Sequence, residues 1–255
     1  MKISAVIIAG NEENNIADAI RSVDWADEIL LIDSESTDRT REIAEDLGAR
    51  VIVRPWPGFA AQKQFGVEAA LFDWILSLDA DERVSLELRA EIQSVQHADS
   101  GADGYRLPRL TNYMGRAIRH CGWYPDWQLR FFNRRNGKWK DVLVHESVEM
   151  THGAKIEKLK GNIIHFTAND ALHHHEMIGT RYAPLAAQQM FDNGKRTSPL
   201  RIVTAGAVAF ISTFVLKLGF LDGFPGFCIS RFAAHHAFLK HLRLWELQNE
   251  RSSLD

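Results

Sequence analysis

The chain has 255 residues, a formal charge of −3, 45% apolar residues and 25% charged residues. These are average values for a globular protein, and the length allows one large domain or one domain with an appendage. With so small a net charge we expect no nucleic-acid partner. Cys121 and Cys228 show no disulfide or metal-ligand spacing, which fits a reducing compartment. The N-terminus enters an apolar run without a basic leader, so we do not expect export.

The charge is unevenly distributed along the chain. Residues 1–150 hold 18 Lys and Arg against 25 Asp and Glu, whereas residues 151–255 hold 12 against 8 together with eight of the eleven histidines. An acidic first part and a mildly basic second part indicate two surfaces with different partners.

Short apolar runs alternate with segments of helical spacing in the first hundred residues. We predict strands at 3–9, 28–33, 50–54 and 73–78, and helices at 11–23, between 38 and 48, and at 58–71. This alternation predicts right-handed crossovers and a mostly parallel, Rossmann-like sheet with flanking helices. The carboxyl ends of the strands should then meet at one edge and bring 9–11, 33–34 and 79–81 together.

The run Asp79-Ala80-Asp81 places two carboxylates at that edge of the sheet. Carboxylate oxygens suit Mg²⁺ or Mn²⁺, which often share a site with substrate phosphates. The alternative for this run is a solvated turn followed by a helix cap. No Gly-x-Gly-x-x-Gly follows the first strand and no Gly-x-x-x-x-Gly-Lys-Ser/Thr occurs, so dinucleotide and P-loop sites lose their main support.

Three ordered motifs carry a resemblance to a known family. They are Ala5-Val6-Ile7-Ile8-Ala9-Gly10-Asn11-Glu12-Glu13, Asp33-Ser34-Glu35-Ser36-Thr37-Asp38 and Asp79-Ala80-Asp81-Glu82. They resemble the signatures of family 2 inverting glycosyltransferases, which have the GT-A fold. Later motifs, Trp127 to Phe132, Val144-His145-Glu146 and Leu221-Asp222-Gly223, resemble the lipopolysaccharide core β-glucosyltransferase subgroup (WaaE/KdtX-like proteins). The resemblance spans roughly residues 1–250.

The resemblance implies a donor site for a UDP-sugar. It implies that Asp33 accepts a hydrogen bond from uracil and that Asp79 faces the ribose. The other residues that it places on the nucleotide sugar are Ala9, Asn11, Glu12, Lys63 and Arg130. Alternatives stay open here: Asp33 could cap the turn at 34–38, and Lys63 could face solvent.

The resemblance also implies an Mn²⁺ or Mg²⁺ ion bound to the diphosphate. Asp81 is the expected ligand, with Asp79 and His145 as further candidates. A hydrogen-bonded strand histidine is the alternative for His145. The metal would act as a Lewis acid on the leaving group.

An inverting transfer requires a general base that takes the proton from the acceptor hydroxyl. Glu146 is the preferred base, because a strand over 138–144 would deliver it, and Asp126 and Asp141 are the other candidates. The Glu-Asp pair that family members use is not literally present. We predict a β-hairpin of strands 127–133 and 138–144 around Asn136-Gly137 in this acceptor region.

Arginines in the same region could bind an anion. Arg134 and Arg135, beside Arg130, are candidates to clamp a diphosphate or an anionic acceptor.

The C-terminal third is expected to be helical and close to a membrane. Residues 202–216 carry no charge but fall short of the length expected for a spanning helix, and 227–247 resembles a basic amphipathic helix suited to an anionic surface. The alternative is a helical hairpin packed on the sheet. We therefore predict a GT-A catalytic domain over 1–165, with a nucleotide-binding part (1–100) and an acceptor part (101–165), and a helical membrane-associated region over 166–255.

The expected enzyme transfers a hexose, glucose above all, from a UDP-sugar to a lipopolysaccharide core or similar lipid-linked acceptor. It would be cytoplasmic and peripheral on the cytoplasmic face of the inner membrane. Two alternatives remain: a glycosyltransferase acting on a polyprenyl phosphate or another glycan, and a non-catalytic sugar-nucleotide or glycan-binding scaffold.

Overall fold

The computed structural model describes residues 1–97, 101–140, 146–167 and 171–252. The chain divides into two compact units. The first unit comprises 1–110 and 126–165, and the second comprises 111–125 and 166–255. The segment 111–125, which the sequence places in the acceptor part, therefore groups with the C-terminal helices. The division of the first part by function stays a prediction.

The predicted parallel half of the sheet is confirmed. The strands β3 (Arg50–Val53), β2 (Glu28–Asp33), β1 (Ile3–Ala9) and β4 (Trp74–Asp79) lie side by side in this order and run parallel. All seven residues of β1 are buried, because helices cover both faces of the strand and apolar residues therefore fill every position.

The other half of the sheet is mixed. β8 (Asp126–Asn133) runs antiparallel to β4, and the order continues with β6 (Gly104–Tyr113), β12 (Ile163–Phe166) and β5 (Glu82–Val84). Two short strands, β7 (Arg116–Ala117) and β11 (Ile156–Lys158), pair with β6 off this path.

Helices pack on both faces of the sheet and form two apolar cores. One core joins β1 to α1 (Ile16–Ser22), α2 (Thr40–Asp46) and α4 (Leu86–His97). The other joins the opposite side of β1 to α3 (Phe59–Ala69). The helix predicted from residue 11 begins only at Ile16, because Asn11 has a left-handed backbone (φ 57°) that a helix cannot contain.

The predicted β-hairpin around Asn136-Gly137 has the wrong strand pairing. β8 lies between β4 and β6, so both of its edges are already hydrogen-bonded. β9 (Gly137–Trp139) pairs instead with β10 (Val148–Met150) in a separate antiparallel sheet. Residues 141–145, where the second strand was expected to end, lie outside the described residues.

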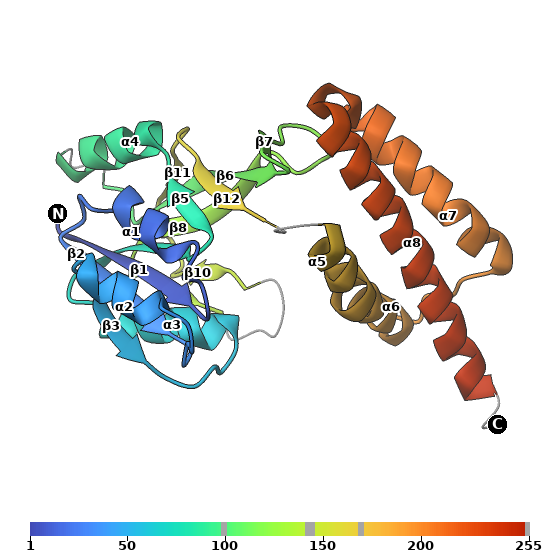
Figure 1. Cartoon of the computed structure of the whole chain (residues 1–255), viewed down its shortest axis with the longest axis horizontal. Helices are drawn as coiled ribbons and strands as arrows, with labels where there is room; N and C mark the ends of the chain where they lie inside the picture. The colour runs from blue at the N-terminus through green and yellow to red at the C-terminus, as the bar shows by residue number, and fades with distance from the viewer. Residues whose placement is uncertain (98–100, 141–145, 168–170, 253–255) are drawn as a thin grey trace. The chain divides into compact units, whose positions relative to one another are not determined.

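The second unit is built on one long helix. α8 (Gly223–Ser252) lies between α6 (Ala183–Asp192) and α7 (Pro199–Ile211) (Figure 1). α5 (Ala171–Glu176) and the π-helical turn η1 (Met177–Tyr182) lead into α6, and η2 (Ser212–Leu216) and η3 (Gly219–Asp222) connect α7 to α8.

One segment of this unit is long and apolar enough to cross a membrane. It runs over the 18 residues Pro199–Leu216, and this conclusion rests on length and composition alone. The helical segment is longer than the charge-free stretch 202–216 identified in the sequence, because Ser198 caps it and Pro199 starts its first turn.

Candidate active site

The carboxyl ends of the parallel strands meet as predicted. In the register of the sheet, Ala9 lies opposite Asp33 and Ile8 lies opposite Asp79. The loops after β1, β2 and β4 therefore begin at one edge of the sheet, where ligands bind in open α/β folds. The chain assembles its polar motifs at this edge.

The first two loops are tied to each other by hydrogen bonds. The Asn11 side chain accepts a bond from the Thr37 backbone N–H at 2.8 Å, and the Asn11 N–H donates to Ser36 Oγ at 2.9 Å. Asp33 is fully buried and accepts bonds from the N–H of Ser36 (2.9 Å) and from its hydroxyl (2.5 Å). In this structure Asp33 thus caps its own turn, and its predicted contact with uracil stays a prediction.

Glu12 lies in the same loop and is half buried. Its carboxylate accepts a bond from the Asn15 side chain at 2.8 Å. Burial raises the pKa of Glu12, and the neighbouring Asp81 and Asp38 add to this effect, against the Asn15 hydrogen bond. Glu12 is therefore part of the acidic surroundings of Asp81. The predicted contact of Ala9 with the nucleotide is not tested by these bonds.

Lys63 is fully buried and joins two carboxylates of the site. Its Nζ lies 2.9 Å from Asp79 Oδ1 and 3.2 Å from Glu146 Oε1. The ring of Trp139 lies 5.0 Å from the same nitrogen. The solvent-facing alternative for Lys63 is therefore wrong. This lysine connects a helix, the end of β4 and the loop that carries the candidate base.

Glu82 and Arg109 belong to the site, although the sequence reading did not select them. Glu82 is fully buried, with Oε1 3.6 Å from Arg130 and 3.4 Å from Arg109, and it accepts a bond from the Asp79 N–H at 3.0 Å. Arg109 also pairs with Asp126 at 2.7 Å. The position of Glu82 directly after the acid pair does not by itself indicate this role, because the role depends on its burial beside Arg109 and Arg130.

The charges around Asp79 keep this carboxylate ionised. Burial alone would raise its pKa, but Lys63 and Arg130 outweigh burial and hold the pKa of Asp79 well below its ordinary value. The Nη2 atom of Arg130 lies 3.1 Å from Asp79. Burial lowers the pKa of Arg130, but Glu82 and Asp79 raise it more strongly, so this pKa is raised overall. The cluster is thus a set of fixed, mutually compensating charges.

Asp81 and His165 are the residues that fit a divalent metal. Their side chains face each other with Nε2 3.3 Å from Oδ2, because Glu82 pairs with His165 in the register of β5 and β12. The buried Nδ1 of His165 has no hydrogen-bond partner among the described residues. A carboxylate and an imidazole suit Mn²⁺, with substrate oxygens completing its coordination. The chain shows no ready-made group of three or more ligands within the described residues.

Asp79 and His145, the other predicted metal ligands, are not part of this pair. Asp79 contacts two cations, so its oxygens are already matched in charge. His145 lies outside the described residues.

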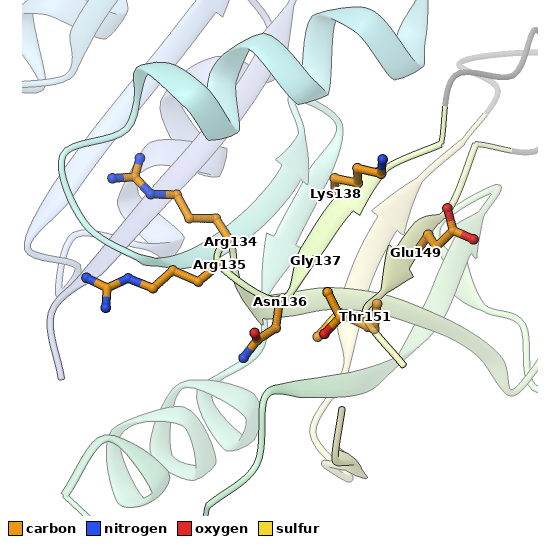
Figure 2. A pocket seen from close by; sticks show the side chains of 8 residues that line it. Arg134, Arg135, Asn136, Gly137, Lys138, Glu149 and Thr151 are labelled. Atoms are coloured by element: carbon orange, nitrogen blue, oxygen red, sulfur yellow. The ribbon is translucent and has the colours of Figure 1, made fainter. Parts of the chain in front are cut away.

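Arg134 and Arg135 do not join this site. They pair with Asp73 at 3.2 and 2.6 Å, and Asp73 precedes β4 whereas Asp79 ends it. The two arginines therefore lie at the opposite end of the strand. A hollow of about 240 Å³ is lined there by residues 134–138 and 149–151, with both arginine side chains extending away from Lys138 and Glu149 (Figure 2).

The fold and the site define a class of enzyme. A Rossmann-like sheet that turns into a mixed sheet, with carboxylates and cations at the carboxyl ends of its parallel strands, is the GT-A arrangement of glycosyltransferases. Residues 4–157 match the family described as glycosyl transferase family 2, and the chain belongs to this family.

Relatives with similar sequences cover nearly the whole chain. An uncharacterized glycosyltransferase of Rickettsia typhi is 33% identical over 96% of this chain and 87% of its own length. The lipopolysaccharide core biosynthesis glycosyltransferase LpsC of Rhizobium meliloti is 27% identical over 96% of this chain and 93% of its own.

Solved structures of glycosyltransferases are also similar. Staphylococcus aureus TarS (residues 1–349) in complex with UDP-GlcNAc is 13% identical with a TM-score of 0.49, and covers 98% of this chain and 92% of its own. Glucosyl-3-phosphoglycerate synthase of Mycobacterium tuberculosis, in complex with Mn²⁺, UDP and glucosyl-3-phosphoglycerate, is 18% identical with a TM-score of 0.49. The match covers 77% of this chain and 81% of the synthase chain.

Proposed function

We propose that this glycosyltransferase moves a hexose, with glucose as the first candidate, from a UDP-sugar to a lipopolysaccharide core or similar lipid-linked acceptor, with inversion at the anomeric carbon. The observation that carries the proposal is the charged cluster around Asp79, which lies at the ligand-binding edge of the sheet in a family 2 chain. The likeness to LpsC supports the choice of acceptor.

In this proposal the nucleotide lies over the ends of β1 and β2. The loop at Asn11 and Glu12 lines the base and ribose, and Asp33 holds the turn that shapes this pocket or turns to the uracil. Asp79 lies on the sugar side. The buried cations Lys63 and Arg130 fix the orientation of Asp79 and add positive potential where the diphosphate charge increases during the reaction.

Asp81 and His165 would hold the divalent cation. Such an ion stabilises the negative charge of the UDP leaving group as the glycosidic bond breaks. Imidazole and carboxyl groups bind Mn²⁺ or Mg²⁺ only in their deprotonated forms. Metal binding therefore requires a neutral His165 and an ionised Asp81. We assign the ion to this pair and not to Asp79, because Asp79 is already paired with two cations.

Glu146 is the proposed general base. It takes the proton of the acceptor hydroxyl as the oxygen attacks the anomeric carbon from the face opposite UDP. Glu146 lies beside Asp79 through their shared contact with Lys63, and this proximity supports its assignment to the sugar end of the site. Asp126 is the weaker candidate, because Arg109 and Gln128 both bind its carboxylate.

The proposed enzyme works on the cytoplasmic face of the inner membrane. A lipid-linked acceptor requires an enzyme that stays close to the bilayer, and UDP-sugars are cytoplasmic. The apolar segment of the second unit supports this location by composition.

The metal assignment can be tested with Asp81→Asn. We expect UDP release from UDP-glucose in Mn²⁺ to fall by about 100-fold or more, because the leaving group loses its stabilised charge. The stabilisation of the protein by Mn²⁺ in a thermal shift assay should also disappear. Asp18→Asn, at an exposed acid on α1, is the matched control and should behave like the wild type. Equal rates and equal Mn²⁺ shifts for Asp81→Asn would contradict the assignment.

A further inference from the structure

The outward face of α7 and η2 is apolar. Positions 200, 203, 208, 211 and 215 follow one another at intervals of three to five residues and hold Leu, Val, Val, Ile and Val, all exposed. Only 11% of the segment Pro199–Leu216 is buried in this structure. In a soluble helix such residues normally face the core, and polar residues face water. We call these five residues the α7 face.

The other side of α7 accounts for its packing within the second unit. Ile202 is buried, and Gly206 lies so close to α8 that an added Cβ would be 3.3 Å from the Ala234 carbonyl oxygen. The helix therefore uses its small and buried residues against α8 and leaves the α7 face exposed.

The apolar surface continues beyond the helix. Further exposed apolar residues lie at the end of η2, in the connection to α8 and in the first turn of α8: Leu216, Leu218, Phe220, Leu221 and Phe224. An exposed apolar surface of this extent on one unit indicates an interaction site.

The charges next to this surface are positive. Between Asp192 and Asp222 the chain contains two lysines and two arginines and no acid, and the adjoining segment 111–125 contains two arginines and no acid. Arg116 donates to the Leu221 carbonyl oxygen at 3.2 Å, which ties these arginines to the apolar connection.

Asp222, the acid at the end of this stretch, does not add negative charge to the surface. Asp222 is buried and accepts bonds from the backbone N–H groups of Arg119 and His120 at 3.2 and 2.8 Å, and His120 Nδ1 lies 3.0 Å from it. A surface that is apolar in its centre and cationic at its edge complements an anionic bilayer surface.

We propose that the α7 face and its connection to α8 dock onto anionic phospholipids, with α7 lying in the plane of the interface. The apolar side chains enter the headgroup region, and Arg116, Arg119 and Lys217 contact lipid phosphates. The sequence-based expectation assigned membrane association to the whole region 166–255 and named 227–247 as its basic amphipathic helix, so this site is a narrower and different surface.

An in-plane position follows from the neighbouring helix. By length and composition alone the segment Pro199–Leu216 could also cross a bilayer. Helix α8, which packs along α7, carries Arg231, Lys240 and Arg243, whose insertion into a hydrocarbon core would be costly. The inference deepens the proposed function and rests on it for its biological setting, since docking brings the enzyme to a lipid-linked acceptor.

The test is flotation of the full chain with vesicles, without any sugar nucleotide. We expect the wild type to float with vesicles of phosphatidylethanolamine and phosphatidylglycerol and to remain unbound with phosphatidylcholine alone. The double variant V203Q/V208Q should partition into vesicles about tenfold less or weaker still. The two valines are 77% and 64% exposed, and their replacement removes apolar surface that would otherwise insert into the bilayer. R116Q/R119Q should lose the preference for anionic vesicles.

The matched control is L172Q/L185Q, at exposed leucines on α5 and α6, which should float like the wild type. Flotation of V203Q/V208Q at the wild-type level would overturn the proposal. So would a wild-type dimer in light scattering that V203Q/V208Q converts to a monomer, because the α7 face would then bind a second copy. UDP release by the same variants reports on the proposed function separately and should not change.

Discussion

Lys63 is the residue on which the geometry of the candidate site depends most. A fully buried ammonium group between Asp79 and Glu146 is stable only because both carboxylates compensate its desolvation. Since no surface of Lys63 is exposed, we infer that it positions the two acids and does not bind substrate directly.

Replacing Lys63 by Met should therefore damage both stability and activity. Loss of one partner from a buried ion cluster costs about 3–5 kcal/mol of unfolding free energy, which urea denaturation can measure. We expect kcat to fall while KM for the UDP-sugar changes little, because the donor contacts remain. Lys63→Arg keeps the charge and should recover part of the stability. A K63M variant with wild-type stability and kcat would show that the cluster has no role.

The lowered pKa of Asp79 predicts a defined acid sensitivity. A carboxylate whose folded-state pKa lies below its unfolded value of 3.8 contributes stability above that value, and the contribution disappears as the pH falls towards the folded-state pKa. We expect the unfolding free energy of the wild type to decrease as the pH falls below about 4. The decrease should be smaller in Asp79→Asn. Parallel pH profiles for the two proteins would contradict this account.

At the scale of elements, the contact between α3 and β1 holds Lys63 in place. Gly66 lies one turn after Lys63 on the same helix, and a Cβ added there would come 2.5 Å from Val6 Cγ1 and 3.1 Å from Ile32 Cγ1. The absence of a side chain lets the helix approach the sheet closely enough for Lys63 to reach Asp79.

Gly66→Ala is expected to push α3 away from the sheet. Overpacking of this kind costs about 1–3 kcal/mol, outweighing the better helix propensity of alanine. Urea denaturation should show the loss, and UDP release should fall with it because Lys63 moves with its helix. Gly179→Ala is the control, since nothing lies within 4 Å of a Cβ at that helical position. A G66A variant as stable as the wild type would show that the helix can shift without penalty.

At the scale of the whole molecule, the two units differ in charge. The first unit has 19 Lys and Arg against 26 Asp and Glu, and the second has 11 against 7. An anionic membrane therefore attracts the second unit and repels the first, so the charge distribution favours binding through the second unit.

This difference predicts that vesicle binding depends on salt. Raising NaCl from about 50 to about 500 mM shortens the range of these charges to a few ångströms, and flotation with anionic vesicles should fall severalfold. Part of the binding should remain, because the α7 face is apolar and its contribution does not weaken with salt. Binding that is unchanged over this range would show that the cationic residues do not contact lipid.

The amino-acid sequence by itself determined the parallel strands, the meeting of their polar ends, and the position of Asp79 and Asp81 at that edge of the sheet. These features follow from local patterns, because a buried strand needs a continuous apolar run and its end is marked by the first polar residues. Only the tertiary structure decided the rest: the burial of Lys63, the part played by Glu82, the position of His165 opposite Asp81 and the outward direction of the apolar side of α7. Each of these depends on strand register or helix orientation between segments far apart in the chain, which no local pattern encodes.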